Sequence, residues 1–229
     1  MPQIVSNLDL LRRVPLFAML TPIQADALEM TVEKQSFQRG EILARQHSKS
    51  DQLLVLLSGQ VRLVTTGTCG RQLFLNKLRT GDVFDEMSLI DDKPHSATAI
   101  ADASTDVLIL SRDDFLRCLE ENSHVAFAFM NRLVDRLRRA NRRIEAFALL
   151  GVHGRVGLAL VENASLSLDG SMVIDEKISR QDLAKMVGAS RERVSRVMKD
   201  LEAQGFIRTD SADHLTLKST LLQQFFWRA

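Results

Sequence analysis

Residues 179–196, SRQDLAKMVGASRERVSR, decide the fold of the C-terminal part of the chain. Ser179 and Asp182 have the spacing of a helix capping box, and Gly188 supplies a turn after a helix of about two turns. Ser190 is placed to cap a second helix. This order of cap, helix, glycine turn, cap and helix predicts a helix-turn-helix.

The second helix of this motif presents a polar face of a kind that reads DNA. Arginine suits the O6 and N7 acceptors of guanine, and glutamate accepts from the amino group of cytosine. Between residues 177 and 200, seven basic residues stand against three acidic ones, although the whole chain has a net charge of only +1. The basic surface is therefore local. The residues expected to meet DNA are Arg180, Ser190, Arg191, Glu192, Ser195, Arg196 and Lys199.

A β-hairpin is predicted directly after the motif. Two short apolar runs, residues 206–209 and 214–217, flank the turn-like sequence Asp210-Ser211-Ala212-Asp213. Such a hairpin would be the wing of a winged helix. The plainer alternative, a compact helical hairpin with a solvated charged face, accounts for neither the wing nor the local charge.

Short strands are predicted in the N-terminal half, after a few short helices between residues 7 and 34. Glycine or polar residues separate runs of strand-forming residues at 52–57, 60–65, 72–78, 97–101 and 107–110. Many short strands with sharp corners favour a β-roll or barrel. The fold class is therefore α+β.

One long helix is predicted for residues 111–150, which contain no proline or glycine, with a short turn near residues 122–123. A heptad seam runs along it through Met130, Leu133, Leu137, Ala140, Ile144 and Phe147. A second apolar line follows Phe127, Met130, Val134 and Leu137. We expect one line to pack on the roll and the other on a second copy of the chain. The alternative is an amphipathic helix used only within the chain.

A hinge is predicted where Gly151 and Gly154 interrupt the helical pattern. The expected domains are therefore an effector-binding roll with its preceding helices, a dimerisation helix and a DNA-binding winged helix, at residues 1–110, 111–150 and 151–229.

The composition excludes several other classes of protein. In 229 residues, 45% are apolar and 26% are charged, which is ordinary for a globular protein. The longest uncharged stretch, residues 14–25, is interrupted by two prolines and is too short to cross a membrane. Cys69 and Cys118 form no metal-binding or disulfide pattern. We expect a cytoplasmic protein without membrane association that requires no metal or resident cofactor.

Two further stretches resemble a known family. Residues 80–89, TGDVFDEMSL, followed by PHSATA at 94–99, look like the phosphate-binding cassette of the bacterial family that contains the cyclic AMP receptor protein and the fumarate–nitrate reductase regulator. Residues 110–155 look like its dimer helix and hinge. The resemblance covers nearly the whole chain. It implies a homodimer that binds a two-fold symmetric DNA site, responds to an effector held between roll and helix, and contacts RNA polymerase.

Carried over residue by residue, the resemblance supplies three effector ligands. Glu86 matches a glutamate that holds a ribose hydroxyl, Ser96 matches a phosphate ligand, and Arg136 matches an arginine of the long helix. In the recognition helix, Arg191 and Arg196 match base-reading residues together with Glu192, which implies a half-site similar to TGTGA. Ser195 matches the other branch of the family instead.

Three positions depart from the family's cyclic AMP site. His95 replaces the phosphate-binding arginine, and a largely neutral imidazole lacks the bidentate guanidinium fork. Asp85 replaces a glycine and adds negative charge near the phosphate position. Asn141, with Ala140 before it, stands where a Thr-Ser pair contacts adenine. These departures predict a different effector or none.

Cyclic di-GMP is one effector that would suit these residues. Its guanines could stack on or pair with Arg136, Arg139 and Arg143, while Asp85 or Glu86 accept from guanine N–H groups. The alternatives are cyclic AMP itself, a regulator that needs no ligand, and arginines that only form a solvated helix face.

Functions outside the family fit less well. An enzyme could use Asp85, Glu86 and His95 as an acid–base group, but the sequence has no zinc-protease motif, no phosphate-binding loop and no nucleophile elbow. A haem sensor would need a pair of axial ligands that the sequence does not place.

Overall fold

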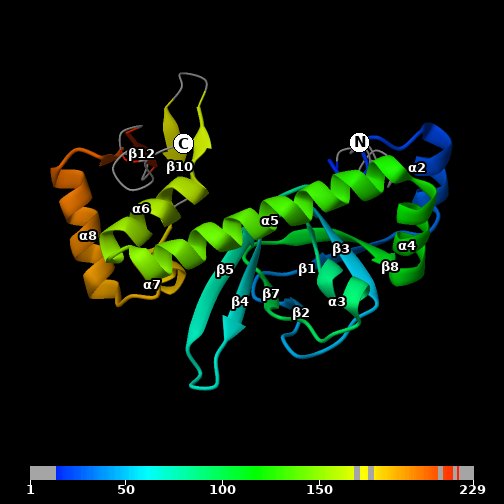
Figure 1. Ribbon diagram of the computed structural model, residues 1–229, viewed down its shortest axis with the longest axis horizontal. Coiled ribbons are helices and arrows are strands. Elements are labelled where there is room, and N and C mark those ends of the chain that lie inside the picture. Colours follow the sequence, from blue (N-terminus) through cyan, green and yellow to red (C-terminus); the bar gives the residue numbers. More distant parts are fainter. Residues whose placement is uncertain (1–13, 168–170, 175–177, 211–213, 219–220, 222–229) are drawn as a thin grey trace. The chain divides into compact units, whose positions relative to one another are not determined.

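The computed structural model describes residues 14–167, 171–174, 178–210, 214–218 and 221. The chain divides into two compact units, residues 1–136 and 137–229. This division falls inside the long helix, so the predicted domain limits at residues 110 and 150 stay predictions. Helices and strands occur in both units, which confirms the α+β class (Figure 1).

The first unit is built on two four-stranded antiparallel sheets. One has the order β1 (Glu33–Phe37), β8 (Thr105–Ser111), β3 (Gln52–Ser58) and β6 (Val83–Phe84). The other has the order β2 (Ile42–Ala44), β7 (Thr98–Ala101), β4 (Val61–Thr66) and β5 (Gln72–Leu78). All five predicted strands are present within two residues of their expected limits. The three short strands β1, β2 and β6 were not predicted.

Strand β3 shows why the roll needs helices around it. Its residues Leu53 to Leu56 are all buried, because alternate side chains enter two different cores. Leu54 and Leu56 pack between the two sheets, whereas Leu53 and Val55 pack beneath helices. The unbroken apolar run thus follows from burial on both faces.

Three helices cover that outer face of the roll: α2 (Pro22–Glu29), α4 (Arg112–Glu121) and the start of α5 (Ser123–Leu149). A short helix, α3 (Glu86–Asp91), follows β6. The predicted turn in the long helical region is confirmed at Asn122, whose side-chain amide donates to the carbonyl of Cys118 at 2.9 Å. Next to it, the rings of Phe115 and Phe129 meet edge to face with centroids 5.2 Å apart.

The face of α5 that meets the roll differs from the prediction. Val125 and Phe129 are buried against the roll and Leu133 packs beside them, whereas Phe127 and Met130 are 63% and 53% exposed. The expectation that one of the two apolar lines would pack on the roll is therefore wrong for all but Leu133. The reason is that the contact begins in the first turn of α5, before either line starts.

The second unit combines three helices with a small sheet. Helix α6 (Val152–Asn163) packs on α7 (Arg180–Val187) and α8 (Arg191–Ala203) around a core that includes Leu160, Leu183, Val194 and Met198. The sheet has the order β11 (Ile207–Thr209), β12 (Leu215–Leu217), β10 (Met172–Ile174) and β9 (Ser165–Leu166). The predicted wing is confirmed by the antiparallel pairing of β11 with β12. Residues 211–213 at its tip lie outside the described residues.

The predicted break after α5 is confirmed at Gly151, which is the N-cap of α6. Gly154, in contrast, lies inside α6, so its prediction as a helix breaker is wrong. A Cβ atom at this position would lie 3.0 Å from the side chain of Leu150, and glycine allows the two to approach closely.

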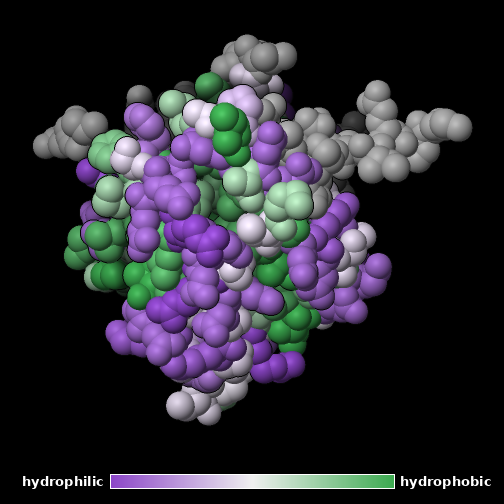
Figure 2. Space-filling model, turned by 90° about the vertical axis from the view of Figure 1, so that its right-hand side faces the viewer, coloured by the Kyte–Doolittle hydropathy of each residue, from purple (hydrophilic) through white to green (hydrophobic). Residues whose placement is uncertain are grey.

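No helix in the described part of the chain is both long and apolar enough to cross a membrane. On the face shown in Figure 2, hydrophilic side chains predominate and hydrophobic ones gather in separate patches.

Glycine at position 59 is required by the corner between β3 and β4, and this can be tested. Gly59 has a φ of +84°, and a Cβ atom there would lie 2.3 Å from the carbonyl oxygen of Ser104. Gly40 is a matched control, because its φ is +90° but nothing lies within 4 Å of its Cβ position. We expect Gly59→Ala to lower the free energy of unfolding by about 1–3 kcal/mol more than Gly40→Ala in denaturant titrations. Equal losses would mean that backbone strain alone selects glycine at this corner.

Candidate functional site

A cavity in the first unit gathers most of the predicted effector residues. It has a volume of about 50 Å³, is partly open to solvent, and lies between β2, β4, β7, α3 and α5. Its lining includes five of the eight predicted ligands: Asp85, Glu86, His95, Ser96 and Arg136. The cavity is therefore the candidate effector site.

Asp85 and His95 form a buried pair in the wall of this cavity. The Asp85 Oδ1 atom lies 2.6 Å from His95 Nδ1, and the two side chains are only 7% and 4% exposed. The Ser50 hydroxyl donates to Asp85 Oδ2 at 2.9 Å. The backbone of His95 is fixed as well, because its N–H donates to the Ser48 carbonyl at 2.8 Å. The imidazole that replaces the expected arginine is thus held by the protein itself.

The backbone conformation of Asp85 explains why the family that the sequence resembles has glycine at this position. Asp85 has a φ of +75°, a left-handed conformation that glycine adopts freely and aspartate tolerates better than most residues. Burial raises the pKa of the Asp85 carboxyl, although the charge of His95 and the hydrogen bond from Ser50 act in the opposite direction. The pair therefore sits in a site where an additional anion would be poorly accommodated.

Glu86 offers the cavity an acceptor that is not used within the described structure. It is 2% exposed, and one oxygen of its carboxylate accepts a hydrogen bond from Arg136 of α5. The other oxygen, Oε2, has no hydrogen-bond partner among the described residues. A buried acceptor without a partner costs about 1–3 kcal/mol, which a donor from a ligand could recover.

The cavity lacks the geometry of an acid–base relay. Ser88 Oγ lies 2.8 Å from the same His95 nitrogen that meets Asp85. A relay of the serine–histidine–aspartate type needs the two partners on opposite ring nitrogens. Among the described residues there is also no group of three His, Cys, Asp or Glu side chains placed to hold a metal ion.

Three predicted effector residues belong to the second unit. Arg139 and Asn141 are exposed on α5. Arg143 is held by Glu162 of α6, with its Nε donating to Glu162 Oε2 at 2.9 Å. They do not line the cavity of the first unit, and their part in effector binding stays a prediction.

The helix-turn-helix has the predicted caps and turn. Ser179 Oγ accepts from the backbone N–H of Asp182 at 3.0 Å, and Ser190 Oγ accepts from that of Arg193 at 3.3 Å. Gly188 ends α7 with a φ of +60°. Local side-chain chemistry therefore determines both helix starts and the turn between them.

Most of the predicted DNA-reading residues are exposed, and all but Arg180 and Ser190 lie on α8. Ser190, Arg191, Glu192, Arg196 and Lys199 are exposed, whereas Arg180 and Ser195 are half-buried. Hydrogen bonds from its own backbone N–H and from Ser190 hold the pKa of Glu192 below its ordinary value. Its carboxylate is therefore ionised near neutral pH and able to accept from a cytosine amino group.

Sequence reasoning missed several partners of these residues. Ser50 and Ser88 hold the Asp85–His95 pair, and no local pattern marks them. In the second unit, the ring of Phe147 lies 3.1 Å from the Cβ position of Gly188, and the Arg155 guanidinium lies 5.1 Å from the same ring centroid. The end of α5 thus packs directly on the turn of the DNA-reading motif.

The two units match two domain families. Residues 34–122 match the cyclic nucleotide-binding domain, and residues 154–220 match the Crp-like helix-turn-helix domain. The cyclic AMP receptor protein of Thermus thermophilus is 30% identical over 210 residues, which cover 92% of this chain and 95% of that protein. The cAMP-activated global transcriptional regulator Vfr of Pseudomonas aeruginosa is 30% identical over 168 residues, with coverage of 69% and 77%.

Solved structures agree with this assignment. The catabolite activator protein of Thermus thermophilus matches with a TM-score of 0.54 and 29% identity over 93% of this chain and 98% of that one. The c-di-GMP responsive regulator CLP of Xanthomonas campestris matches with a TM-score of 0.71 over 87% and 100%, and its 20% identity supports the fold alone. The chain therefore belongs to the family of the cyclic AMP receptor protein and the fumarate–nitrate reductase regulator, and it is a DNA-binding transcription regulator rather than an enzyme.

Proposed function

We propose that this regulator acts as a homodimer on a two-fold symmetric DNA site, and that a cyclic nucleotide in the cavity of the first unit controls its affinity for DNA. The observation that carries the homodimer is the exposed apolar surface of α5. The observation that carries the effector is the unpartnered carboxylate oxygen of Glu86. The contact with RNA polymerase and the location in the cytoplasm rest on the family.

The apolar side chains of α5 support a seam between two copies. In the first unit, Met130 and Val134 are 53% and 46% exposed, and in the second, Leu137 and Ile144 are 61% and 67% exposed. Apolar residues that recur at heptad spacing are stabilised when an equivalent helix covers them. A two-fold axis beside α5 would cover the exposed apolar side chains of both copies, because each copy presents the same face of the helix.

A dimer of this kind would place two copies of α8 on successive major grooves. Each α8 would present Arg191, Glu192 and Arg196 to one half-site, similar to TGTGA by family resemblance. Arg180 and Lys199 would meet the phosphate backbone, which sets affinity more than sequence preference.

The cavity favours an effector that donates hydrogen bonds over one recognised by its phosphate. Glu86 Oε2 needs a donor, while Asp85 and His95 already satisfy each other where a phosphate ligand is expected. Both nucleotides carry such donors, cyclic AMP in its adenine amino group and ribose hydroxyl and cyclic di-GMP in its guanines, so the choice of cyclic di-GMP rests on the arginines of α5, which suit the acceptors of guanine. Arg139 is the more available guanine partner, because Arg143 is paired with Glu162. Effector binding would shift the population between conformations with different dimer seams and different placements of α8.

The dimer seam is tested by placing charges on it. We expect the double variant Leu137→Glu, Ile144→Glu to sediment as a monomer and to bind operator DNA at least about tenfold more weakly, since two buried like-charge pairs would oppose association. Leu149→Glu is the control, because Leu149 is exposed on α5 but belongs to neither apolar line. A double variant that remains dimeric would contradict the seam.

Base reading is tested at Glu192. Removing its carboxylate with Glu192→Ala should relax discrimination at one base pair per half-site by about 1–3 kcal/mol, as measured against a panel of single-base operator variants. Lys199→Ala should instead weaken binding to all sequences equally and reduce the salt dependence. An equal loss of affinity for all operator variants in Glu192→Ala would mean that this residue contacts the DNA backbone rather than a base.

The effector is tested by thermal melting with cyclic AMP, cyclic GMP and cyclic di-GMP, each alone. At about 100-fold excess over the dissociation constant, a ligand stabilises the protein by about 2.7 kcal/mol, or several degrees. We expect this shift with cyclic di-GMP only, and we expect Arg139→Ala to reduce it. A shift with cyclic AMP alone would contradict the choice of cyclic di-GMP as the effector. No shift with any of the three would point to a regulator that is independent of these ligands.

The two cavity residues that depart from the family's pattern, Asp85 and His95, can be changed to the family's residues and tested by the same thermal melting. The double variant Asp85→Gly, His95→Arg removes a negative charge and supplies a guanidinium fork for a phosphate. We expect it to gain a melting shift with cyclic AMP, whereas Asp85→Gly alone does not. An unresponsive double variant would show that these two positions do not decide phosphate binding.

A further inference from the structure

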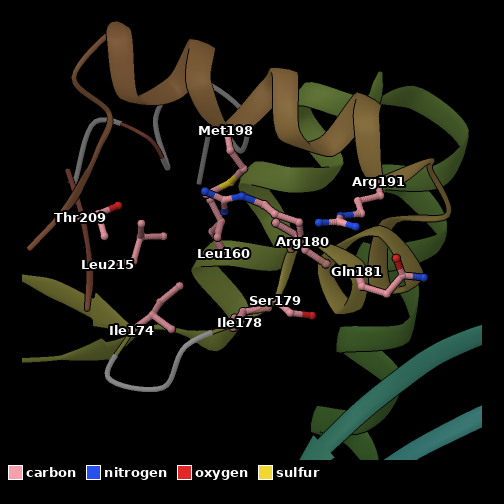
Figure 3. A pocket seen from close by; sticks show the side chains of 11 residues that line it. Leu160, Ile174, Ile178, Ser179, Arg180, Gln181, Arg191, Met198, Thr209 and Leu215 are labelled. Atoms are coloured by element: carbon pink, nitrogen blue, oxygen red, sulfur yellow. The ribbon is translucent and has the colours of Figure 1, made fainter. Parts of the chain in front are cut away.

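A second cavity, partly open to solvent, lies in the DNA-binding unit beneath α8. It has a volume of about 330 Å³, which is the size of a small-molecule site. Figure 3 shows apolar side chains around it from α6, β10, α8 and the wing, namely Leu160, Ile174, Met198 and Leu215. Arg180 from α7 and Arg191 from α8 complete the lining.

The size of this cavity needs an explanation. Leu160, Ile174 and Met198 are at most 3% exposed and belong to the core of the unit. Protein cores are packed so closely that few voids exceed one water molecule, and an unfilled apolar void lowers stability. An apolar space of this volume beside a packed core is therefore more typical of a ligand site than of a packing defect.

The charges around the cavity indicate what the ligand carries. In Figure 3, the Arg180 side chain extends toward Met198 and Leu160, and the Arg191 guanidinium points toward Arg180. Neither side chain forms a hydrogen bond or an ion pair with another residue in the described ranges. Two guanidinium groups next to apolar walls match a carboxylate attached to an apolar chain, because Arg binds carboxylates bidentately.

We propose that this cavity binds a single-chain amphipathic carboxylate of the medium-chain fatty acid type. The chain lies among Leu160, Ile174 and Leu215, and the carboxylate pairs with Arg180 and Arg191. Both arginines are also proposed DNA contacts, so the bound acid withdraws two positive charges from the DNA-reading face. This second step rests on the proposed function, and it makes the acid an antagonist of DNA binding that acts without the effector cavity of the first unit.

The direct test is isothermal titration calorimetry of the full chain with decanoate in the absence of DNA. Decanoate is kept below the concentration at which it self-associates. Decanol and butyrate serve as comparisons, since one lacks the charge and the other lacks the apolar chain. We expect saturable binding of decanoate and binding at least about tenfold weaker for both comparison compounds. Equal binding of decanol would remove the role of the arginines and overturn the proposal.

Matched variants locate the site. Arg180→Gln removes one guanidinium, and Thr209→Trp fills the cavity from an exposed position on β11. Their controls are Arg193→Gln, which removes the same charge from an exposed position of α8, and Thr216→Trp, which adds the same ring on β12. We expect both cavity variants, and neither control, to lose decanoate affinity at least about tenfold. Losses of equal size in cavity variants and controls would overturn the proposal.

A competition experiment separates this proposal from the proposed function. Decanoate should raise the dissociation constant of fluorescently labelled operator DNA for the wild-type chain and leave that of Thr209→Trp unchanged. If DNA binds but decanoate does not, the cavity proposal fails and the regulator stands. If decanoate binds but no DNA sequence is preferred, the proposed DNA site fails and the cavity stands.

Discussion

The burial of Val125 and Phe129 against the roll is the constraint on which both proposed surfaces of α5 depend. Once these two side chains enter the core, helical periodicity fixes every other position in this part of the helix. Arg132 and Arg136 then meet Asp82 and Glu86 of the roll, and Met130 stays exposed. One hydrophobic contact thereby orients the wall of the effector cavity and the apolar seam together.

One wall of the effector cavity consists of side chains that bond to each other, whereas another keeps a carboxylate oxygen without a partner among the described residues. Asp85 and His95 hydrogen-bond each other within a buried network that includes Ser50 and Ser88, so the polar atoms of this wall have partners within the protein. Glu86 is different, because one of its oxygens keeps Arg136 while the other has no partner in the described structure. In the proposed effector site, Glu86 would therefore contribute an acceptor for a donor of the ligand, while the Asp85–His95 pair occupies the expected phosphate position.

Sequence patterns correctly predict the strands and helix caps that depend on residues close together in the chain. Strand β5 lies where its apolar run predicted it, and both helix caps of the DNA-reading motif follow from Ser179 and Ser190. Contacts that form only when distant parts of the chain pack together could not be predicted. Ser50 and Asp85 are 35 residues apart and share no motif. The sequence predicts a helix break at Gly154 because it does not show that the Leu150 side chain lies 3.0 Å from its Cβ position.

The contact between Phe147 and Gly188 limits how this regulator can evolve. Gly188 has a positive φ, and a Cβ atom there would lie 3.1 Å from the Phe147 ring, so a larger residue would require the ring to shift. A side chain at position 188 therefore has to be accommodated by the end of α5, so the helix end and the turn constrain each other. The exposed residues Arg191, Glu192 and Arg196 carry no such restriction. In the proposed DNA interface, changes on the outer face of α8 would therefore alter the sequence preference without disturbing the contact between Phe147 and the turn.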